Sequence, residues 1–255
     1  MMLTETSPLP LLPKRIISLV PSQTALLHHL GLEEETIGIT KFCVHPPSWK
    51  KDKQIIGGTK TVNIEKIIAL NPDLIIANKE ENVKEQIEEL AARFPVWVTD
   101  VNNLTDAYQM IKDVGILTNR EKKSAELIDQ IKIGFHELGA ASKKINTCYL
   151  IWKDPYMTVG GDTFISDMME KAGCVNVFST STRYPEISIN QIKKSNCELI
   201  LLSSEPYPFS DKHIEALQAE IPHIRILLAD GEMFSWYGSH LLQSPSYFKN
   251  LLFSL

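Results

Sequence analysis

The chain has 255 residues, with 26 Lys and Arg against 31 Asp and Glu, so its formal net charge at pH 7 is −5. Hydrophobic residues make up 44% and charged residues 22% of the sequence, which excludes a disordered chain, a collagen-like repeat and a small disulfide-rich scaffold. The acidic balance, without a stripe of basic residues interleaved with aromatics, argues against nucleic-acid binding. A chain of this length forms one large domain or two lobes.

The N-terminal region shows neither a membrane span nor an export signal. The uncharged stretch Ile16 to Leu32 is broken by Pro21 and by polar residues, so it is too polar to cross a bilayer. Residues 1–14 lack a basic start, three prolines divide them, and no lipobox cysteine follows. These residues alone predict a cytoplasmic protein, or one whose leader was removed or lies outside this chain.

Short apolar strands alternate with helices over the first hundred residues. The predicted strands are 15–20, 37–40, 55–56, 74–77 and 96–98, and the predicted helices are 24–30, 63–70 and 83–93. Ser22 is expected to cap the first of these helices. This alternation is typical of a parallel α/β sheet.

The pattern changes at Leu104 to a long helical stretch that reaches about Ala141, and Gly115 and Asn119 are the places where it can be interrupted. Strand–helix alternation resumes at Thr147 and continues to the end of the chain. The predicted fold is therefore α/β with two Rossmann-like lobes, each with a parallel sheet, joined by one long backbone helix. The predicted boundaries are 14–103 for the N-terminal lobe, 104–142 for the connecting helix and 143–255 for the C-terminal lobe.

A weak internal repeat supports two related lobes. Segment 64–76 matches segment 189–201 in register, with Ile-x-x-Ile near the start and Asn-x-acidic-Leu-Ile near the end. The alternative explanation is the composition that all helix–strand units share. If the repeat is real, we expect two lobes with a cleft between them, and ligands favour such clefts and the carboxyl ends of parallel strands.

Polar and aromatic residues gather in the loops that follow the predicted strands. The candidate ligand-binding residues are Ser22, Cys43, His45, Thr59, Asn78, Trp152, Tyr156, Trp236 and Tyr237. Because loops normally favour polar residues, the aromatics indicate a flat apolar face for a ligand, although any one of them can instead cover the core.

Cys43 and His45 are candidate metal ligands, because a thiol and an imidazole two residues apart in a loop suit a transition metal or the metal of a chelate. A tight site needs about four donors, which Glu80, Glu81 or His240 could complete. The alternative is that Cys43 is a small buried residue and His45 begins a Pro-rich turn. The other three cysteines show no metal-ligand spacing and are expected to be buried.

The glycine pair in Gly57-Gly58-Thr59-Lys60 lacks the spacing of a nucleotide-hydrolysing P-loop, so we expect a sharp turn or a close backbone approach to a ligand. The sequence also has no Gly-x-Ser-x-Gly, His-Glu-x-x-His or Gly-x-Gly-x-x-Gly motif.

Arg15 to Ser22, Gly38 to Thr40 and Asn63 to Ala77 together resemble the class III, or helical-backbone, substrate-binding proteins of ABC importers for cobalamin, haem and ferric siderophores. The most specific part is the block Asn-x-Glu-x-Ile-x-x-Leu-x-Pro-Asp-Leu-Ile that begins at Asn63. The resemblance extends over about residues 14–255.

The resemblance implies a monomeric, non-enzymatic protein that binds a metal chelate between its lobes and delivers it to an ABC permease, at the membrane surface or in the periplasm. In that family a glutamate on each lobe docks onto permease arginines, and Glu65 and Glu232, the latter near Ser235, are the corresponding candidates. Two alternatives remain. One is a cytoplasmic chelatase-like enzyme that uses Cys43, His45 and Glu80, and the other is a binder of free transition-metal ions that uses Cys43, His45 and carboxylates.

Overall fold

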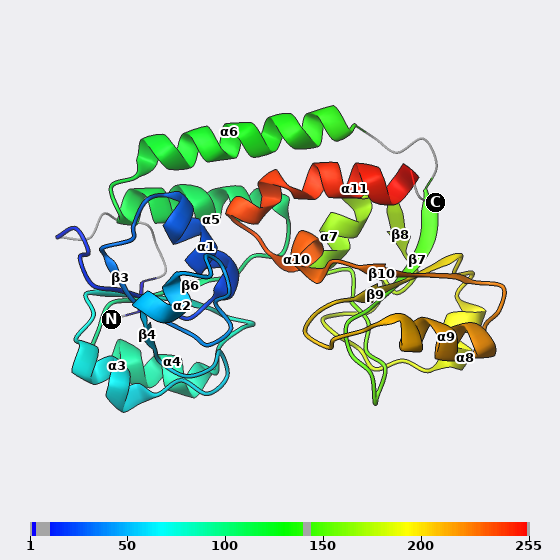
Figure 1. Ribbon diagram of the computed structural model, residues 1–255, viewed down its shortest axis with the longest axis horizontal. Helices are drawn as coiled ribbons and strands as arrows, with labels where there is room; N and C mark the ends of the chain where they lie inside the picture. The colour runs from blue at the N-terminus through cyan, green and yellow to red at the C-terminus, as the bar shows by residue number, and fades with distance from the viewer. Residues whose placement is uncertain (1, 4–10, 140–143, 254–255) are drawn as a thin grey trace. The chain divides into compact units, whose positions relative to one another are not determined.

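The computed structural model describes residues 2–3, 11–139 and 144–253. These residues form two compact units, each built on a parallel sheet (Figure 1). The first unit contains the described residues of 1–101, 105–131 and 237–240, and the second contains those of 102–104, 132–236 and 241–255. None of the helices described is long and apolar enough to span a bilayer.

The sheet of the first unit has the order β1-β6-β5-β2-β3-β4, and all its pairings are parallel. Its strands are β1 (Met2–Leu3), β2 (Ile16–Ser18), β3 (Thr36–Ile39), β4 (Gln54–Ile55), β5 (Leu74–Asn78) and β6 (Val96–Thr99). The helices of this part of the chain are α1 (Pro21–His29), α2 (Trp49–Asp52), α3 (Ile64–Leu70), α4 (Lys84–Ala91) and α5 (Leu104–Leu117). The central strands β2 and β5 are buried along their whole length, as expected of a parallel sheet covered on both faces.

The sheet of the second unit has the order β10-β9-β7-β8, again with parallel pairings only. Its strands are β7 (Ile145–Leu150), β8 (Cys174–Asn176), β9 (Leu199–Ser203) and β10 (Arg225–Ala229). Helices α6 (Glu121–Leu138) and η1 (Ser239–Leu242) have residues in both units, and α7 (Phe164–Lys171), α8 (Ile189–Lys194), α9 (Asp211–Glu220), α10 (Gly231–Ser235) and α11 (Ser244–Phe253) belong to the second. The predicted α/β fold with two parallel sheets is confirmed.

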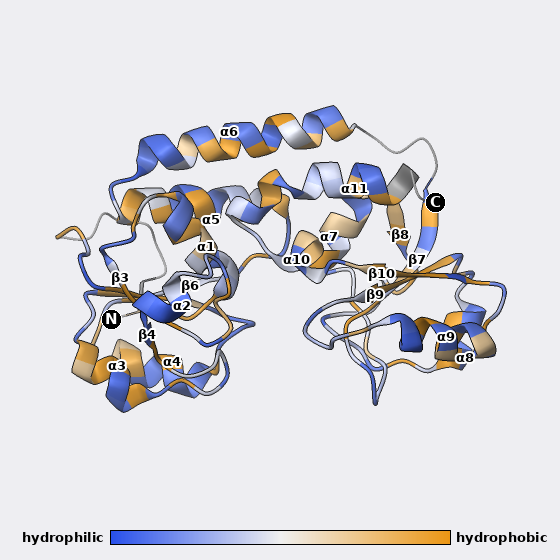
Figure 2. Ribbon diagram, viewed as in Figure 1, coloured by the Kyte–Doolittle hydropathy of each residue, from blue (hydrophilic) through white to orange (hydrophobic). Residues whose placement is uncertain are grey.

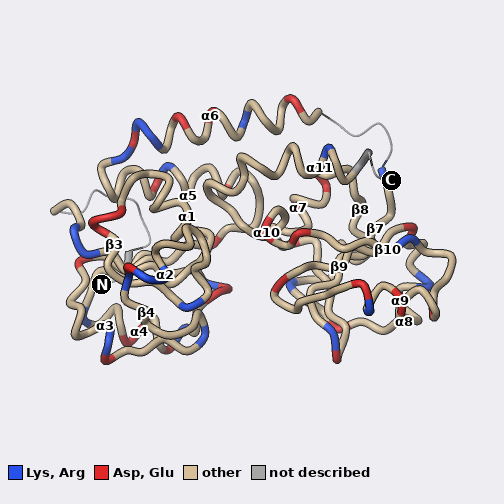
Figure 3. The backbone as a smooth tube through the Cα atoms, viewed as in Figure 1, with Lys and Arg blue, Asp and Glu red and all other residues tan. Residues whose placement is uncertain are grey.

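Apolar and charged residues are segregated as this architecture requires. The strands are mostly apolar, whereas helices such as α6 carry alternating polar and apolar stripes (Figure 2). Charged residues lie mainly along the helices and loops (Figure 3). Cys148 and Cys174 are buried and Cys197 is half-buried, so the predicted packing role of these thiols agrees with their placement.

The stretch predicted as one connecting helix is instead two helices, α5 and α6. Asn119 lies between them with a left-handed φ of 55°, which a helix cannot continue. Gly115 does not interrupt α5. A side chain at Gly115 would collide with Ser124, so this glycine permits the close approach of α6. Residues 140–142, the end of the predicted helix, lie outside the described residues.

The internal repeat of the sequence corresponds to a repeat in structure. Helix α3 is capped by Asn63, whose side chain accepts a hydrogen bond from the backbone of the third helical residue, and α8 is capped in the same way by Ser188. Each helix is followed by an asparagine with left-handed φ, 44° at Asn71 and 53° at Asn196, which turns the chain into the next strand.

The acidic residue two positions after each of these asparagines, Asp73 or Glu198, also has the same role in both units. The Asp73 carboxylate accepts a hydrogen bond from the Arg15 backbone N–H at 2.8 Å, and the Asp73 N–H donates to the Arg15 carbonyl at 3.0 Å. Glu198 repeats both contacts with the backbone of Asn146, at 3.1 and 2.8 Å. Each carboxylate therefore binds the backbone near the start of the neighbouring strand: β2 beside β5 in the first unit, and β7 beside β9 in the second.

Candidate ligand-binding site

The carboxyl ends of parallel strands meet at one edge of a sheet, so the loops that follow the strands of the first unit gather at one edge. The predicted residue Ser22 lies there, buried in the first turn of α1. It is not the helix cap that the sequence predicted. Pro21 occupies the first helical turn, where its fixed φ and missing N–H are tolerated, and Val20 is the cap residue without a side-chain hydrogen bond.

Asn78, at the end of β5, organises the loop that follows it. Its Nδ2 donates to the carbonyl and the hydroxyl of Thr99 at 3.1 and 3.0 Å. Its Oδ1 accepts from the backbone N–H groups of Glu80 and Glu81 at 2.8 and 3.1 Å. Because donors and acceptor are all used within the protein, Asn78 holds the edge rather than offering a group to a ligand.

Thr59 lies in a tight turn, as expected of the glycine pair before it. The φ of Gly57 is 108°, and a side chain at this position would collide with the backbone of Thr61. The turn is tied to the β5 loop because the Asn82 side chain donates to the Thr59 carbonyl at 3.0 Å.

Gln23 is a buried polar residue at the same edge that the sequence pattern did not place in the candidate set. Its Nε2 donates to the hydroxyl of Thr99 at 2.6 Å. Its Oε1 is buried and has no hydrogen-bond partner within the part of the chain that the structure describes. This oxygen is thus an acceptor for a water molecule or for a donor on a ligand.

Cys43 is fully buried in the first unit. Its thiol is hydrogen-bonded to the hydroxyls of Thr24 at 3.0 Å and Thr40 at 3.2 Å. Burial raises the pKa of the thiol, and the two hydroxyls only partly oppose that shift. A buried thiol with a raised pKa is a poor metal ligand, so the predicted ligand role of Cys43 is not supported, and its contacts anchor the loop after β3.

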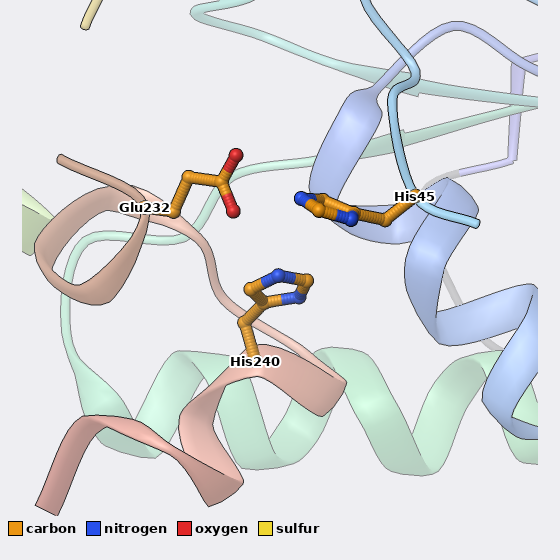
Figure 4. A group of neighbouring side chains, drawn as sticks. All are labelled: His45, Glu232 and His240. Atoms are coloured by element: carbon orange, nitrogen blue, oxygen red, sulfur yellow. The ribbon is translucent and has the colours of Figure 1, made fainter. Parts of the chain in front are cut away.

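His45, two residues further along this loop, lies next to His240 of η1 within the first unit. Their ring centroids are 5.0 Å apart with an interplanar angle of 47°. A ring nitrogen of each lies within 4.8 Å of the other (Figure 4). Of the residues suggested to complete a site with His45, His240 is thus brought to it.

Segment 237–240 is held against α1, although it is distant in sequence. Gly238 has a φ of 110°, and a Cβ at this position would lie 3.3 Å from the Cβ of Leu26 and 3.4 Å from the carbonyl of Ser22. The close approach and the left-handed backbone both favour glycine here. The predicted site residue Tyr237 is buried in the same segment.

The second unit presents an aromatic group at the carboxyl edge of its sheet. Trp152, just after β7, keeps 40% of its surface exposed and meets Tyr207 edge-on at 5.6 Å. Tyr207 packs in turn on Phe209 at 4.7 Å, and its hydroxyl lies 3.3 Å from His213 Nε2. Tyr156 is half-buried and packs, like Tyr207, against the hydrophobic core of the second unit. Burial raises the pKa of the Tyr156 hydroxyl.

Trp236 is fixed by Glu205, which follows β9. The Glu205 carboxylate accepts from Trp236 Nε1 and from the Ser235 hydroxyl, each at 2.8 Å. Burial raises the pKa of this carboxyl, while these two hydrogen bonds lower it. Trp236 is buried, so its indole is oriented by this contact. Glu205 and Tyr207 lie in a strand-end loop but were not among the predicted site residues, because the partners that give them their roles lie in other segments of the chain.

The two predicted docking residues lie in first turns of helices. Glu65 is exposed in α3, and Glu232 is half-exposed in α10, where its N–H donates to the Asp230 side chain at 3.1 Å. In the structural repeat, the α8 residue that corresponds to Glu65 is Asn190, which carries no charge.

Two all-parallel α/β units, with imidazole, amide and aromatic groups at their strand ends, define a two-lobed binding protein. Residues 16–223 match the sequence model of the periplasmic binding protein family, and the chain belongs to that family.

A vitamin B12-binding protein of Pectobacterium atrosepticum is 25% identical over 243 residues, which cover 91% of this chain and 85% of the relative. The ABC transporter substrate-binding lipoprotein YvrC of Bacillus subtilis is 27% identical over 201 residues, which cover 74% of this chain and 63% of YvrC. The crystal structure of the periplasmic vitamin B12-binding protein BtuF of Vibrio cholerae has the same fold, with a TM-score of 0.79, 20% identity and coverage of 95% and 97% of the two chains.

The family match makes the chain a binding protein of the periplasmic binding protein type. It is a binding protein rather than an enzyme, so the chelatase-like alternative is not retained.

Proposed function

We propose that this protein binds a metal chelate of the cobalamin, haem or ferric-siderophore class and delivers it to the transmembrane subunits of an ABC permease. The observation that carries the ligand class is the exposed Trp152 ring supported edge-on by Tyr207. A rigid aromatic surface suits a large flat or apolar ligand, because an aromatic side chain contributes a large contact area and loses little conformational entropy on binding. The vitamin B12-binding relative supports the same class.

Some of the strand-end residues are assigned to ligand contact, and the others hold the loops that carry them. We assign ligand contact to Ser22, His45 and Tyr237 of the first unit and to Trp152, Tyr156 and Trp236 of the second. Thr59 is a further polar contact at the first edge. Cys43 and Asn78 hold the loops in place, because their polar atoms are engaged within the protein.

A calorimetric titration of wild-type protein and of Trp152→Ala with cyanocobalamin, haemin and ferric siderophores tests the proposal. We expect wild-type protein to bind one of these chelates and the variant to bind it at least about tenfold more weakly, or about 1.4 kcal/mol. Ile133→Ala is the matched control, because Ile133 is an exposed apolar residue on α6, outside the strand-end loops. Equal affinities of wild-type protein and Trp152→Ala would contradict the assignment.

For the partner, we propose that Glu65 is the permease contact of the first lobe. The corresponding α8 residue Asn190 is uncharged, so a second carboxylate has to come from elsewhere in the second lobe, and Glu232 is the candidate. Because relatives are named as a lipoprotein and as periplasmic, we propose that the protein acts at the membrane surface or in the periplasm.

A further inference from the structure

We propose that His45 and His240 form a two-imidazole site for a divalent transition-metal ion that has open coordination positions. The proposal goes beyond chelate binding, because a chelate whose metal is already saturated has no position for either ring. It rests on the 5.0 Å separation of the two ring centroids within the first unit and on a ring nitrogen of each within 4.8 Å of the other.

The loop that carries His45 is anchored on one side. The thiol of Cys43, two residues before it, is bound by the hydroxyls of Thr24 and Thr40, and the Cys43 N–H donates to the Thr40 carbonyl at 3.1 Å. These contacts fix the loop to α1 and to the end of β3. The backbone that carries His45 is therefore held rigidly, and a site on rigid elements loses less conformational entropy when it binds a ligand.

The segment that carries His240 is also held against α1, by the close approach of Gly238. Gly238 brings the chain into close contact with Leu26 and Ser22 of α1, and η1 begins at the next residue. His240 is buried and His45 is half-buried, so the pair is partly shielded from water. Two segments far apart in the sequence are thus attached to one helix, and each contributes one imidazole.

Imidazole nitrogen is a good ligand for Ni²⁺, Cu²⁺, Zn²⁺ and Co²⁺. With metal–nitrogen bonds of about 2.1 Å, two imidazoles in adjacent coordination positions have their nitrogens about 3 Å apart. The proposal therefore requires the two side chains to rotate so that their nitrogens, now within 4.8 Å of each other, approach to about 3 Å. The pair supplies two donors, so the other positions belong to water or to a chelator that leaves two adjacent positions empty.

Isothermal titration calorimetry with nickel, on untagged protein, distinguishes binding of a hydrated metal ion from binding of a metal held by an open chelator. The titrants are Ni²⁺ alone, Ni²⁺–nitrilotriacetate, which leaves two adjacent positions open, and Ni²⁺–EDTA, in which the chelator fills the coordination sphere. We expect one equivalent of Ni²⁺ or of Ni²⁺–nitrilotriacetate to bind, and no binding of Ni²⁺–EDTA. Binding of the nitrilotriacetate complex alone would identify an open chelate as the ligand of the pair, whereas binding of Ni²⁺ alone would identify the bare ion.

Variants locate the site. His45→Ala and His240→Gln are expected to weaken nickel binding at least tenfold. His28→Ala, which removes half of the adjacent His28–His29 pair on α1, and His136→Ala, at an exposed position of α6, are the matched controls and should bind as wild-type protein does. Cys43→Ala should also retain the metal, because its thiol packs against hydroxyls rather than serving as a ligand.

A spectroscopic measurement on wild-type protein covers the case in which His240→Gln fails to fold. Pulsed electron paramagnetic resonance of the one-equivalent Cu²⁺ complex should show two imidazole nitrogens, and one in His45→Ala. No binding of Ni²⁺ or its nitrilotriacetate complex, equal binding of Ni²⁺–EDTA, or unchanged binding in His45→Ala would overturn the proposal. The chelate titration of wild-type protein is independent, so either proposal can fail while the other stands.

Discussion

Glu205 shows how one side chain ties neighbouring loops of the second unit together. The carboxylate orients the Trp236 indole and accepts a hydrogen bond from the Ser235 hydroxyl. Burial raises its pKa above the ordinary value for glutamate, so the folded protein holds the Glu205 proton more tightly than the unfolded chain does.

The sign of this shift gives a prediction on stability. Where the folded state binds more protons than the unfolded state, the free energy of unfolding falls as pH rises. The contribution of Glu205 is therefore fully present below its unfolded pKa, about 4.3, and is lost as pH rises through the raised folded pKa. Glu205→Gln keeps an acceptor for Trp236 and removes this titration.

We expect the stability of Glu205→Gln relative to wild type to improve as pH rises from 4.5 to 7. Urea unfolding at both pH values measures the difference, and the same substitution at the exposed Glu215 is the control. A relative stability that stays constant, or that worsens towards pH 7, would contradict the assignment.

Cys43 and His45 mark the limit of what residue spacing reveals. Their separation by one residue in a strand-end loop suggested a shared metal. The chain turns at this point, because the Cys43 N–H bonds back to the Thr40 carbonyl, and the thiol enters the core. The imidazole partner of His45 is His240, in a segment near the other end of the chain. The sequence offered His240 as one of three candidates, and only the fold selects it.

At the scale of elements, the alternation of apolar and amphipathic segments predicted the type of the major strands and helices, because a parallel sheet needs buried strands and covering helices. The division of the connecting helix was harder to predict. Asparagine in a helical stretch is compatible with continuation or with a left-handed residue, and the contact of Ser124 with Gly115 favours the folded-back pair α5–α6.

The left-handed asparagines after α3 and α8 predict a matched pair of effects. Asn71→Ala and Asn196→Ala should each lower the free energy of unfolding by about 1 kcal/mol, because a Cβ without a polar group is disfavoured at φ near 50°. Asn71→Gly and Asn196→Gly should stay within about 0.5 kcal/mol of wild type. Urea unfolding at constant pH checks both, and an alanine variant as stable as its glycine counterpart would contradict the explanation.

At the scale of the whole molecule, two lobes share a helix–asparagine–strand unit, yet they differ at one exposed position. Glu65 in α3 corresponds to Asn190 in α8. The repeated contacts of Asp73 and Glu198 are structural and occur in both lobes, whereas the carboxylate proposed for docking occurs at this position in only one.

Capture from detergent-solubilised membranes of the source organism tests the docking proposal. Immobilised wild-type protein should retain ABC permease subunits, identified by mass spectrometry, and Glu65→Gln should retain at least about tenfold less, because the side chain no longer offers a charge to arginine. Glu85→Gln is the control, since Glu85 occupies the equivalent exposed first-turn position of α4. Equal recovery with wild type and Glu65→Gln would exclude Glu65 from the contact.

The central claim, that the protein binds a metal chelate, is tested most directly by thermal unfolding followed by circular dichroism, with and without saturating cobalamin, haemin or ferric siderophores. A chelate present at 100 times its Kd adds about 2.7 kcal/mol to the stability of the folded state. For a chain of this size we expect the midpoint to rise by about 5–10 °C with one chelate class and not with the others. An unchanged midpoint with every chelate would contradict the account.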